Sequence, residues 1–494
     1  MKSVFLRDIY YFSYGGFAMS NSSLAGKRIA SLLDENSFVE IGAQVTSRST
    51  DFNMEPKEAV ADGVVTGYGQ IDGRLVYVYS QDPDVLGGSI GEMHAKKIVE
   101  LYDLALKVGA PVIGLIDSAG LRLNESTDAL AAFGSIYKAM TMASGVILQI
   151  SAVFGKCGGG LSMITGLSDL VFMEEKSAKL FLNSPNALSG NYEEKCDTAS
   201  AAFQSDEAGN VDIVASEAEI FGEIRSYVSL LPSNNDEFGA LSDCTDDLNR
   251  TTDDIGNCTT DTSIALSLIA DDNSYYEVKA GYAKEITTGF IRLNGQTVGC
   301  IANRCEGYDE EGNKTWGSDP VLTFKAANKA ADFVAFCDSF EIPILTLTNV
   351  NGFEADVCNE KNMVRAASRL SYAFADATVP KVNVVIGQAF GSAGIIMNSK
   401  ALGADMTFAW DSAKIGMMPS DLAAKVIFDG KGEDAVKEGA KEYDKLQNSI
   451  DSAARRGYVD GVIAAPQTRK YVISAFEMLY TKREDRPAKK HGTV

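Results

Sequence analysis

A chain of 494 residues is longer than one hydrophobic core usually supports, so we expect two or three domains. Its hydrophobic content of 45% and charged content of 23% are typical of a globular protein. The formal net charge of -22 argues against a nucleic-acid partner, because binding phosphate requires clustered Lys and Arg.

The N-terminal residues, the cysteines and the histidines bear on location and metal binding. Residues 1–18 make a poor secretory signal because charge, Gly and Ser interrupt their apolar run, so we interpret them as a disordered extension. No apolar run approaches the roughly 20 residues that span a bilayer. The 8 cysteines form no C-x-x-C pair, which favours reduced thiols in the cytoplasm. With only 2 histidines in the chain, we expect no metal site.

In the first half of the chain, the pattern predicts a short strand, a hairpin, a helix and a buried strand. The strand covers 38–41, and the hairpin covers 63–79 with Asp72-Gly73 in its turn. Apolar residues at helical spacing predict the helix over 93–108. The nearly continuous apolar run over 111–116 is typical of a strand buried on both faces. Strand and helix then alternate, which favours an α/β layered fold.

The second half repeats this order. Residues 288–301 predict another hairpin with Asn294-Gly295 in its turn, and a helix follows over 321–340. The offset between the two turns is 222 (294 minus 72), whereas Pro111 pairs with Pro343 at an offset of 232 (343 minus 111). The second half therefore gains ten residues after its hairpin (232 minus 222), and 303–318 is the expected place for them.

The offset of 232 continues to the end of the repeat, because Gly155 pairs with Gly387 (387 minus 155). A repeat of this period indicates two domains of one fold, not a solenoid. Asp, Asn, Ser and Thr dominate the stretch between the halves, which we expect to follow the surface, and we expect the basic tail 482–490 in solvent. The expected organisation is an extension at 1–18, an N-terminal domain at 19–232, a polar linker at 233–263 and a C-terminal domain at 264–494.

Each half has a run of small residues where a strand meets a helix, Gly158-Gly159-Gly160 in the first and Gly391-Ser392-Ala393 in the second. Glycine lets a ligand approach the backbone N–H groups closely. At a helix N-terminus those groups are unpaired, and the helix dipole adds to their attraction for a negative oxygen. A close-packed turn explains either run alone equally well, but the matched pair predicts two sites for developing oxyanions.

Other motifs give weaker signals. Residues 117–122 are either a loop that contacts a thioester or phosphopantetheine arm, with Arg122 on a phosphate, or an Asp N-cap with a surface arginine. His94 is best explained as a structural residue near a helix N-terminus, since the second half has Ala326 there. Residues 87–91 match G-x-S-x-G, but no convincing strand precedes them, so a hydrolase elbow is not expected. No Walker A lysine loop occurs, which counts against direct use of ATP.

Taken in order, these motifs resemble the carboxyltransferase (beta) subunits of biotin-dependent acyl-CoA carboxylases and the related alpha subunits of acyl-CoA decarboxylases. The resemblance covers roughly 38–231 and 276–494. The motifs that carry it are Gly87-Gly88-Ser89, Asp117-Ser118-Ala119-Gly120, Cys157-Gly158-Gly159-Gly160, Phe336-Cys337-Asp338, Ala377-Thr378-Val379-Pro380 and the run 390–397.

The resemblance implies an α/β fold of two duplicated crotonase-like domains, a ββα superhelix, with an active site between the N-terminal domain of one subunit and the C-terminal domain of another. It implies that the Gly159 and Gly160 amides hold the thioester oxygen of the acyl-CoA. The Ser392 and Ala393 amides would hold the ureido oxygen of biotin. The residues implied in substrate binding are Gly87, Gly88, Ala119, Gly120, Leu121, Arg122, Gly391, Gly394 and Ile395.

The implied reaction moves a carboxyl group between carboxybiotin and a short acyl-CoA, acetyl-CoA or propionyl-CoA. CO2 leaves carboxybiotin, the biotin anion takes the α-proton, and the enolate attacks CO2. No Met-Lys-Met biotinylation motif occurs, so we expect biotin on a separate carrier protein, a separate biotin carboxylase subunit, and a homo-oligomer (dimer or hexamer) of this chain. The alternative is the reverse half-reaction, a decarboxylase of methylmalonyl-, malonyl- or glutaconyl-CoA in a sodium-pumping complex at a membrane.

Three positions depart from the family pattern. Many relatives have Pro-Gly-Phe at 351–353, Arg-His-Gly at 365–367, and Gly-Gly-Ala with an aromatic at 391–394, where this chain has Gly394. Serine at 392 keeps its amide, but the missing aromatic leaves the acyl-chain preference open. Two other functions stay open: a crotonase-type hydratase or isomerase, which would use Glu92, Glu125 or Glu174 and leave the second glycine turn unexplained, and a non-catalytic scaffold.

Overall fold

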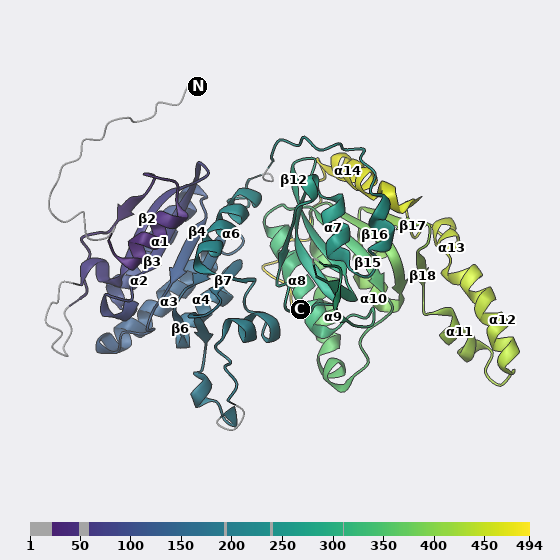
Figure 1. Ribbon diagram of the computed structural model, residues 1–494, viewed down its shortest axis with the longest axis horizontal. Helices are drawn as coiled ribbons and strands as arrows, with labels where there is room; N and C mark the ends of the chain where they lie inside the picture. The colour runs from purple at the N-terminus through teal and green to yellow at the C-terminus, as the bar shows by residue number, and fades with distance from the viewer. Residues whose placement is uncertain (1–21, 49–58, 192–194, 238–240, 310) are drawn as a thin grey trace. The chain divides into compact units, whose positions relative to one another are not determined.

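The structure, a computed structural model, describes residues 22–48, 59–191, 195–237, 241–309 and 311–494. Its contacts divide the chain into two compact units (Figure 1). Unit 1 comprises Met1–Ala201 and Val214–Ser229, and unit 2 comprises Ala202–Ile213 and Leu230–Val494. The extension predicted at 1–18 lies outside the described residues, and the domain limits at 232 and 264 stay predictions.

Unit 1 is built on one mixed sheet whose strands run in the order β1-β2-β3-β4-β5-β7-β9, with a separate pair β6-β8. The strands are antiparallel from β1 to β3 and parallel from β3 through β4 and β5 to β7. Its elements are α1 (Leu24–Leu32), β1 (Val39–Ile41), η1 (Val60–Gly63), β2 (Val64–Ile71), β3 (Arg74–Gln81), η2 (Leu86–Gly88), α2 (Glu92–Val108), β4 (Val112–Ile116), η3 (Leu123–Glu125), α3 (Ser126–Ala143), β5 (Gln149–Val153), β6 (Lys156–Gly158), η4 (Gly159–Ser162), α4 (Met163–Gly166), β7 (Leu170–Glu174), β8 (Lys179–Phe181), η5 (Pro185–Ala187), β9 (Ile213–Ala215) and α6 (Glu217–Leu230).

The predicted hairpin of unit 1 is β2-β3. Asp72 and Gly73 both have positive φ (49° and 80°), which a two-residue turn with the right twist requires. The carboxylate of Asp34 accepts the N–H groups of both residues, at 3.1 and 2.9 Å. β4 is buried at all five positions, as its apolar run predicts, and α2 ends at Gly109 in the left-handed conformation.

Unit 2 repeats the same sheet, in the order β10-β11-β12-β15-β16-β17-β19, with β18 beside β16. Its elements are η6 (Phe203–Glu207), η7 (Asp253–Asn257), α7 (Thr262–Ile269), η8 (Asp271–Asn273), β10 (Tyr275–Val278), β11 (Ile286–Leu293), β12 (Gln296–Asn303), β13 (Glu306–Tyr308), β14 (Lys314–Gly317), α8 (Phe324–Ser339), β15 (Ile344–Val350), α9 (Val357–Asp376), β16 (Lys381–Phe390), α10 (Gly391–Ile396), η9 (Lys400–Leu402), β17 (Met406–Trp410), β18 (Lys414–Gly416), α11 (Ser420–Ile427), α12 (Glu433–Tyr443), η10 (Asp444–Asn448), α13 (Ile450–Arg455), β19 (Gly461–Ile463), η11 (Ala465–Gln467) and α14 (Thr468–Leu479).

The hairpin β11-β12 of unit 2 has the construction of its counterpart. Asn294 and Gly295 have φ of 52° and 75°, and their N–H groups donate to the carboxylate of Asp271 at 3.2 and 2.7 Å. The small hairpin β13-β14 lies within 303–318, where the sequence predicts the ten extra residues. The prediction of a duplicated α/β fold is therefore confirmed.

The segment between the halves contributes to the core of unit 2. Ile255 in η7 is fully buried in the main hydrophobic cluster of this unit, together with strand residues such as Val298 and Leu345. Leu248 and Cys258 of the same polar segment are partly buried and pack against this cluster. The basic tail is also packed: Lys482 donates to the Asp405 carboxylate (2.8 Å), and Arg486 donates to the Asp376 carbonyl (2.9 Å). The prediction that the tail lies in solvent holds for the other seven residues of 482–490, which are exposed, but not for Lys482 and Arg486, whose partners hold the tail on unit 2.

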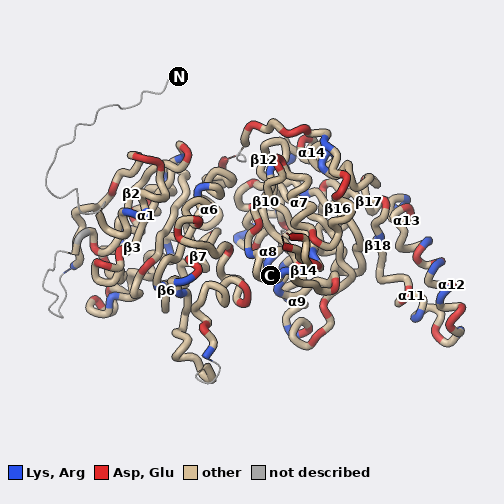
Figure 2. Tube along the Cα trace, viewed as in Figure 1, with Lys and Arg blue, Asp and Glu red and all other residues tan. Residues whose placement is uncertain are grey.

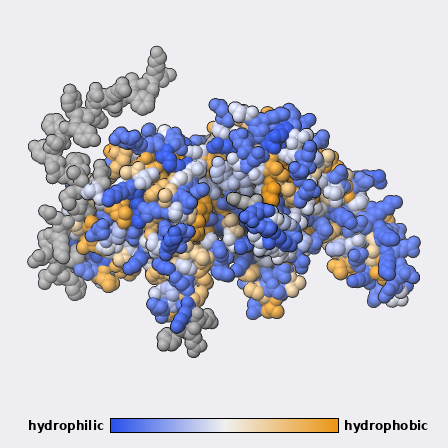
Figure 3. Space-filling view, viewed as in Figure 1, coloured by the Kyte–Doolittle hydropathy of each residue, from blue (hydrophilic) through white to orange (hydrophobic). Residues whose placement is uncertain are grey.

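Charge and hydropathy are unevenly placed in unit 2. Acidic and basic residues alternate along α12, which Figure 2 shows as a mixed red and blue helix. In Figure 1, α11 and α12 extend away from the sheet of this unit as an arm. Leu422, Val426 and Ile427 of α11 are more than half exposed, and apolar colour reaches the surface there in Figure 3.

Candidate active site

The glycine turn of unit 1 follows β5, where the chain forms β6 and then the short helices η4 and α4. Gly159 adopts φ 63°, and a Cβ at this position would have no neighbour within 4 Å, so space opens in front of its backbone. η4 has no side-chain N-cap, and the first amides of a helix have no partner within it. Space is therefore open in front of Gly159, where the sequence predicts an oxyanion site.

Two loops lie beside this turn. The N–H of Ala119 donates to the Gly87 carbonyl and the N–H of Ile90 to the Gly120 carbonyl, both at 2.8 Å. A Cβ at Gly120 would lie 3.6 Å from the Gly158 carbonyl oxygen, so the loop at 118–122 reaches the glycine turn. Gly88 is close to the backbone of Asp117 and has no room for a side chain. Unit 1 thus brings together the predicted residues Gly87, Gly88, Ala119, Gly120, Leu121, Gly159 and Gly160.

Arg122 holds these two loops from inside the protein. Its side chain is 4% exposed, and Nη1 donates to Asp62 Oδ1 (2.6 Å) and Glu125 Oε1 (2.9 Å). Nη2 donates to the Ser89 carbonyl (2.6 Å). The other oxygen of Glu125 accepts the N–H of Glu92 at the start of α2 (2.6 Å). The sequence suggested either a phosphate ligand or a surface arginine. Arg122 is neither, because buried carboxylates already occupy its guanidinium.

His94 has the structural role that the sequence predicts. It is fully buried, with Nδ1 2.9 Å from the Asp62 carbonyl and Nε2 3.2 Å from the Gln81 side-chain nitrogen. The first contact needs a proton on Nδ1 and the second needs a lone pair on Nε2, so the ring is neutral. Burial, together with the charge of nearby Arg122, lowers the pKa of His94 to about 3.

The glycine turn of unit 2 follows β16 and forms the N-terminus of α10. Gly391 has φ 59°, and α10 has neither a side-chain N-cap nor an acidic residue in its first turn. Ser392 is exposed and Ile395 is 46% exposed, whereas Ala393 is 1% exposed. A Cβ at Gly394 would meet the Ala389 backbone at 2.7 Å, so this glycine serves close packing, and its contact with substrate stays a prediction.

The two glycine turns correspond residue by residue. Gly159 and Gly391 are 232 residues apart and share left-handed φ, which makes Gly160 the counterpart of Ser392. Asp117 lies against Gly155 in unit 1, and its counterpart Asn349 lies against Gly387 in unit 2, each side chain leaving no room for a Cβ. The repeat in sequence is thus also a repeat in local structure.

Sequence reasoning missed a pair of buried lysines, Lys97 on α2 and Lys329 on α8. Lys97 Nζ donates to the Ala61 and Val64 carbonyls, and Lys329 Nζ donates to three carbonyls, including that of Ile286 at 2.9 Å. Burial lowers the pKa of Lys97 to about 8 and that of Lys329 to about 7. Their spacing of 232 was the available signal, since a lysine that recurs in a repeat on an apolar helix face is unusual.

The three carboxylates that a hydratase could use are each bonded to another side chain. Glu125 is held by Arg122, Glu174 accepts the Ser177 hydroxyl at 2.6 Å, and Glu92 pairs with Arg48 at 3.0 Å. In the part of the chain that the structure describes, no group of three or more His, Cys, Asp or Glu side chains could hold a metal ion. Nor does any helix of the described ranges have the length and apolarity to cross a membrane.

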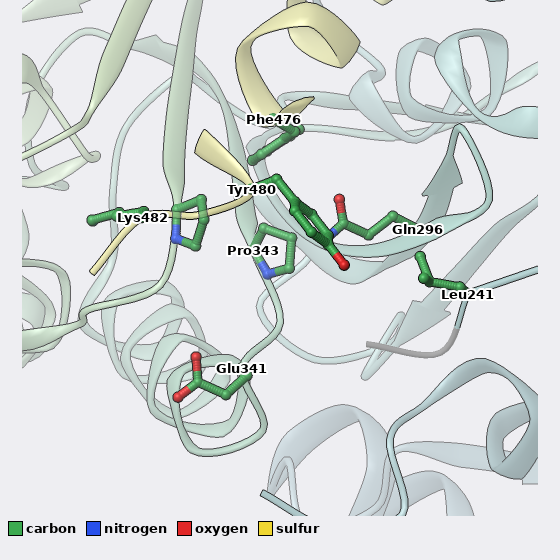
Figure 4. A pocket seen from close by; sticks show the side chains of 8 residues that line it. Leu241, Gln296, Glu341, Pro343, Phe476, Tyr480 and Lys482 are labelled. Carbon is green, nitrogen blue, oxygen red and sulfur yellow. The ribbon is translucent and has the colours of Figure 1, made fainter. Parts of the chain in front are cut away.

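A small pocket in unit 2 lies at the opposite edge of the sheet from α10. Pro343 and Pro380, which line it, immediately precede β15 and β16, whereas α10 follows the other end of β16. Figure 4 shows Tyr480 and Gln296 close together there, with Phe476 beside them. Because ligands of parallel sheets bind at the carboxyl ends of the strands, this pocket is not the candidate active site.

Comparisons with known proteins identify related chains and structures. Residues 19–494 match the family described as the carboxyl transferase domain. The chain is 40% identical over 482 residues to the methylmalonyl-CoA decarboxylase subunit alpha of Veillonella parvula (95% of this chain, 92% of that protein). It is 37% identical over 500 residues to the propionyl-CoA carboxylase beta chain of Roseobacter denitrificans (95% and 93%). The structure of transcarboxylase 12S with methylmalonyl-coenzyme A and methylmalonic acid bound superposes with a TM-score of 0.89 at 38% identity (95% and 92%).

Proposed function

The chain belongs to the carboxyl transferase domain family of biotin-dependent carboxylases and decarboxylases, and we propose that it moves a carboxyl group between carboxybiotin and a short acyl-CoA. The substrates that we propose are acetyl-CoA or propionyl-CoA. Propionyl-CoA is the stronger candidate, because the related proteins are named for propionyl-CoA or for its carboxylated product, methylmalonyl-CoA. The observation that carries the proposal is the pair of equivalent glycine turns, each with a left-handed glycine before an uncapped helix N-terminus.

In unit 1 we assign the Gly159 and Gly160 amides to the thioester oxygen of the acyl-CoA. This oxygen gains negative charge when the α-proton leaves and an enolate forms, so fixed N–H donors stabilise that state more than the substrate. One such donor lowers the free-energy barrier by about 3 kcal/mol. The loops around Gly87 and Ala119 would bind the thioester end of the substrate, and Arg122 would fix both loops without touching it.

In unit 2 we assign the Ser392 and Ala393 amides to the ureido oxygen of biotin. Bound carboxybiotin would supply the carboxyl group and, after its loss, the base for the α-proton. The residues fit this group: its oxygen needs only donors, and the first turn of α10 offers N–H groups without an acidic side chain to repel a developing charge. Ser392 is the better-placed donor, because it is exposed and equivalent to Gly160, whereas Ala393 is buried.

We further propose that biotin arrives on a separate carrier protein charged by a biotin carboxylase subunit, and that this chain forms a homo-oligomer. The related transcarboxylase 12S is described as a hexamer. A second candidate function, a decarboxylase subunit acting on methylmalonyl-, malonyl- or glutaconyl-CoA, is favoured by the 40% identity to a methylmalonyl-CoA decarboxylase subunit. Both directions use the same oxyanion donors, so the partner subunits decide the net direction.

The experiment uses the purified chain with free biotin and a panel of malonyl-CoA, methylmalonyl-CoA and glutaconyl-CoA. We expect release of CO2 that depends on biotin, fastest with the preferred ester. Ser392→Ala keeps the amide and should retain most activity. Ser392→Pro loses the N–H at a position in the first helical turn where proline is tolerated, and should lower kcat/KM for biotin by about 100-fold. Equal activity of the two variants would overturn the assignment.

A further inference from the structure

A network of buried polar side chains ties the end of α10 to the sheet of unit 2. The Thr346 and Thr348 hydroxyls of β15 both lie 2.9 Å from Asn383 Oδ1 of β16. Asn398, two residues beyond α10, donates from Nδ2 to the Thr346 hydroxyl at 3.1 Å. These four side chains are at most 1% exposed. Polar groups buried to this extent fix a single arrangement when they are satisfied, because losing a partner in the dry core costs free energy.

The network reaches the backbone at the C-terminus of α10. The Thr348 hydroxyl lies 3.3 Å from the carbonyl of Met397, the residue that ends the helix. Asn398 has φ 53°, the left-handed conformation that asparagine and glycine commonly adopt just after a helix. Its side chain is thereby directed into the sheet and not to solvent. Backbone and side chain of Asn398 together set where the helix ends.

α10 needs such an anchor because it has only six residues. A helix of this length is not stable by itself, since the cost of its first turn is not repaid by later hydrogen bonds. At about 1.5 Å per residue, the Ser392 amide lies roughly 9 Å from the anchor. A shift at the C-terminal end would therefore turn the N–H groups at the other end.

Unit 1 lacks this network. The residues 232 positions earlier are Gly114, Ile116, Ser151 and Gly166, so three of the four carry no polar side chain. A different link takes its place: the Ser151 hydroxyl lies 2.7 Å from that of Ser168. The network of unit 2 is thus not a general requirement of the fold.

We propose that Thr346, Thr348, Asn383 and Asn398 are positioning residues for the biotin side of the active site. They hold α10 so that the Ser392 N–H points at the ureido oxygen, without contacting biotin themselves. This inference rests on the proposed function for its consequence in turnover, and on the structure alone for its consequence in the rigidity of α10.

The test compares two variants that break the network with a control that makes the same chemical change nearby. Thr348→Val removes one hydroxyl, and Asn398→Gly removes the side chain but keeps the left-handed backbone. The control is Thr407→Val on β17: this residue is 2% exposed, and its hydroxyl has no partner among the described residues. Thr348→Ser, which keeps the hydroxyl, is the rescue variant.

The first readout is amide hydrogen exchange of the segment 391–398. We expect it to be about 10-fold faster in Thr348→Val and Asn398→Gly than in Thr407→Val, with Thr348→Ser near wild type. The second readout is CO2 release with free biotin. We expect kcat/KM for biotin to fall about 10-fold in the two network variants while KM for the CoA ester changes less than about twofold, since the donors assigned to the thioester oxygen lie in unit 1.

Exchange equal to that of Thr407→Val, or equal losses for biotin and the CoA ester, would overturn the proposal. Should Thr348→Val fail to fold, Asn398→Gly decides, because it releases the helix end while leaving the hydroxyls of β15 in place. Wild-type protein without biotin-dependent turnover would reject the proposed function, and hydrogen exchange would then still confirm or reject the anchor.

Discussion

Units 1 and 2 share their backbone hydrogen bonds but differ in the side chains behind the glycine turns. In both, a carboxylate (Asp34 or Asp271) holds the hairpin turn, and a buried lysine on the next helix donates to backbone carbonyls. Ile90 and Leu322, which are 232 residues apart, both bond to the carbonyl of a glycine in the loop after the next strand. The duplicated part of the molecule is therefore its main chain together with the side chains that bond to it.

The side chains that support the turns are charged in unit 1 and neutral in unit 2. Arg122 with two carboxylates supports the loops of unit 1, and its counterpart in unit 2 is Glu354. Unit 2 instead uses hydroxyl and amide groups around Asn383. The two copies of the fold thus keep the turn with its left-handed glycine, and they differ in the side chains that support it.

We expect the largest effect on stability from removing the positive charge of Arg122 in unit 1. Arg122→Met leaves Asp62 and Glu125 buried without a positive partner, which should lower the free energy of unfolding by about 3–5 kcal/mol. Glu354→Gln at the equivalent position of unit 2 should change it by less than about 0.5 kcal/mol. Urea denaturation of both variants measures the difference.

A triple variant separates the charge from the shape of this centre. Arg122→Met combined with Asp62→Asn and Glu125→Gln removes all three charges while keeping similar volumes. We expect it to be more stable than Arg122→Met alone, because no charge is left buried and unpaired. A triple variant at least as destabilised as the single one would show that packing, not charge, accounts for the difference between the units.

The second prediction concerns His94, which is Ala326 in unit 2. Its folded pKa of about 3 lies below the ordinary value of 6.5, so below pH 6.5 the unfolded chain binds a proton that the folded chain does not. The free energy of unfolding therefore decreases as the pH is lowered below 6.5, by up to about 1.4 kcal/mol per pH unit from this residue. His94→Gln should lose about 2 kcal/mol less than wild type between pH 7 and pH 5.

The control for His94 is His491, the other histidine, which is exposed. His491→Gln changes an exposed side chain and should leave the free energy of unfolding within about 0.5 kcal/mol of wild type. Identical curves for wild type and His94→Gln would mean that His94 binds a proton in the folded protein as readily as in the unfolded chain. That result would contradict the neutral ring that its contacts with Asp62 and Gln81 require.

The sequence was sufficient for features that depend on short-range chemistry. Asp72-Gly73 and Asn294-Gly295 predicted both hairpins, because few residues other than Asn, Asp and Gly accept positive φ readily. The spacing of Gly155 and Gly387 predicted the duplicated fold, and the small residues after them predicted turns at the helix N-termini. Each of these inferences needed no information beyond a few neighbouring residues or a comparison of one half with the other.

Features that depend on partners far along the chain were not predictable. Arginine is usually a surface residue, and only the folded chain places Asp62, 60 residues away, against Arg122. The tail at 482–490 finds its partners in the segments around Asp376 and Asp405. The network of Thr346 and Asn398 spans 52 residues and shows no periodicity. Which amide faces an open space also follows only from packing, as the burial of Ala393 beside exposed Ser392 shows.

We expect the smallest effect from substituting two apolar residues that lie at equivalent positions after the glycine turns, Met163 and Ile395. They are 50% and 46% exposed, so either can be changed at little cost in stability. Ile395→Asp should alter the preference between acetyl and propionyl esters by up to about 10-fold, since one methyl group in an apolar pocket contributes roughly 1–3 kcal/mol. Met163→Asp should leave that ratio within about twofold. Steady-state rates with both CoA esters measure it, and equal shifts in the two variants would mean that the acyl preference is not set by unit 2.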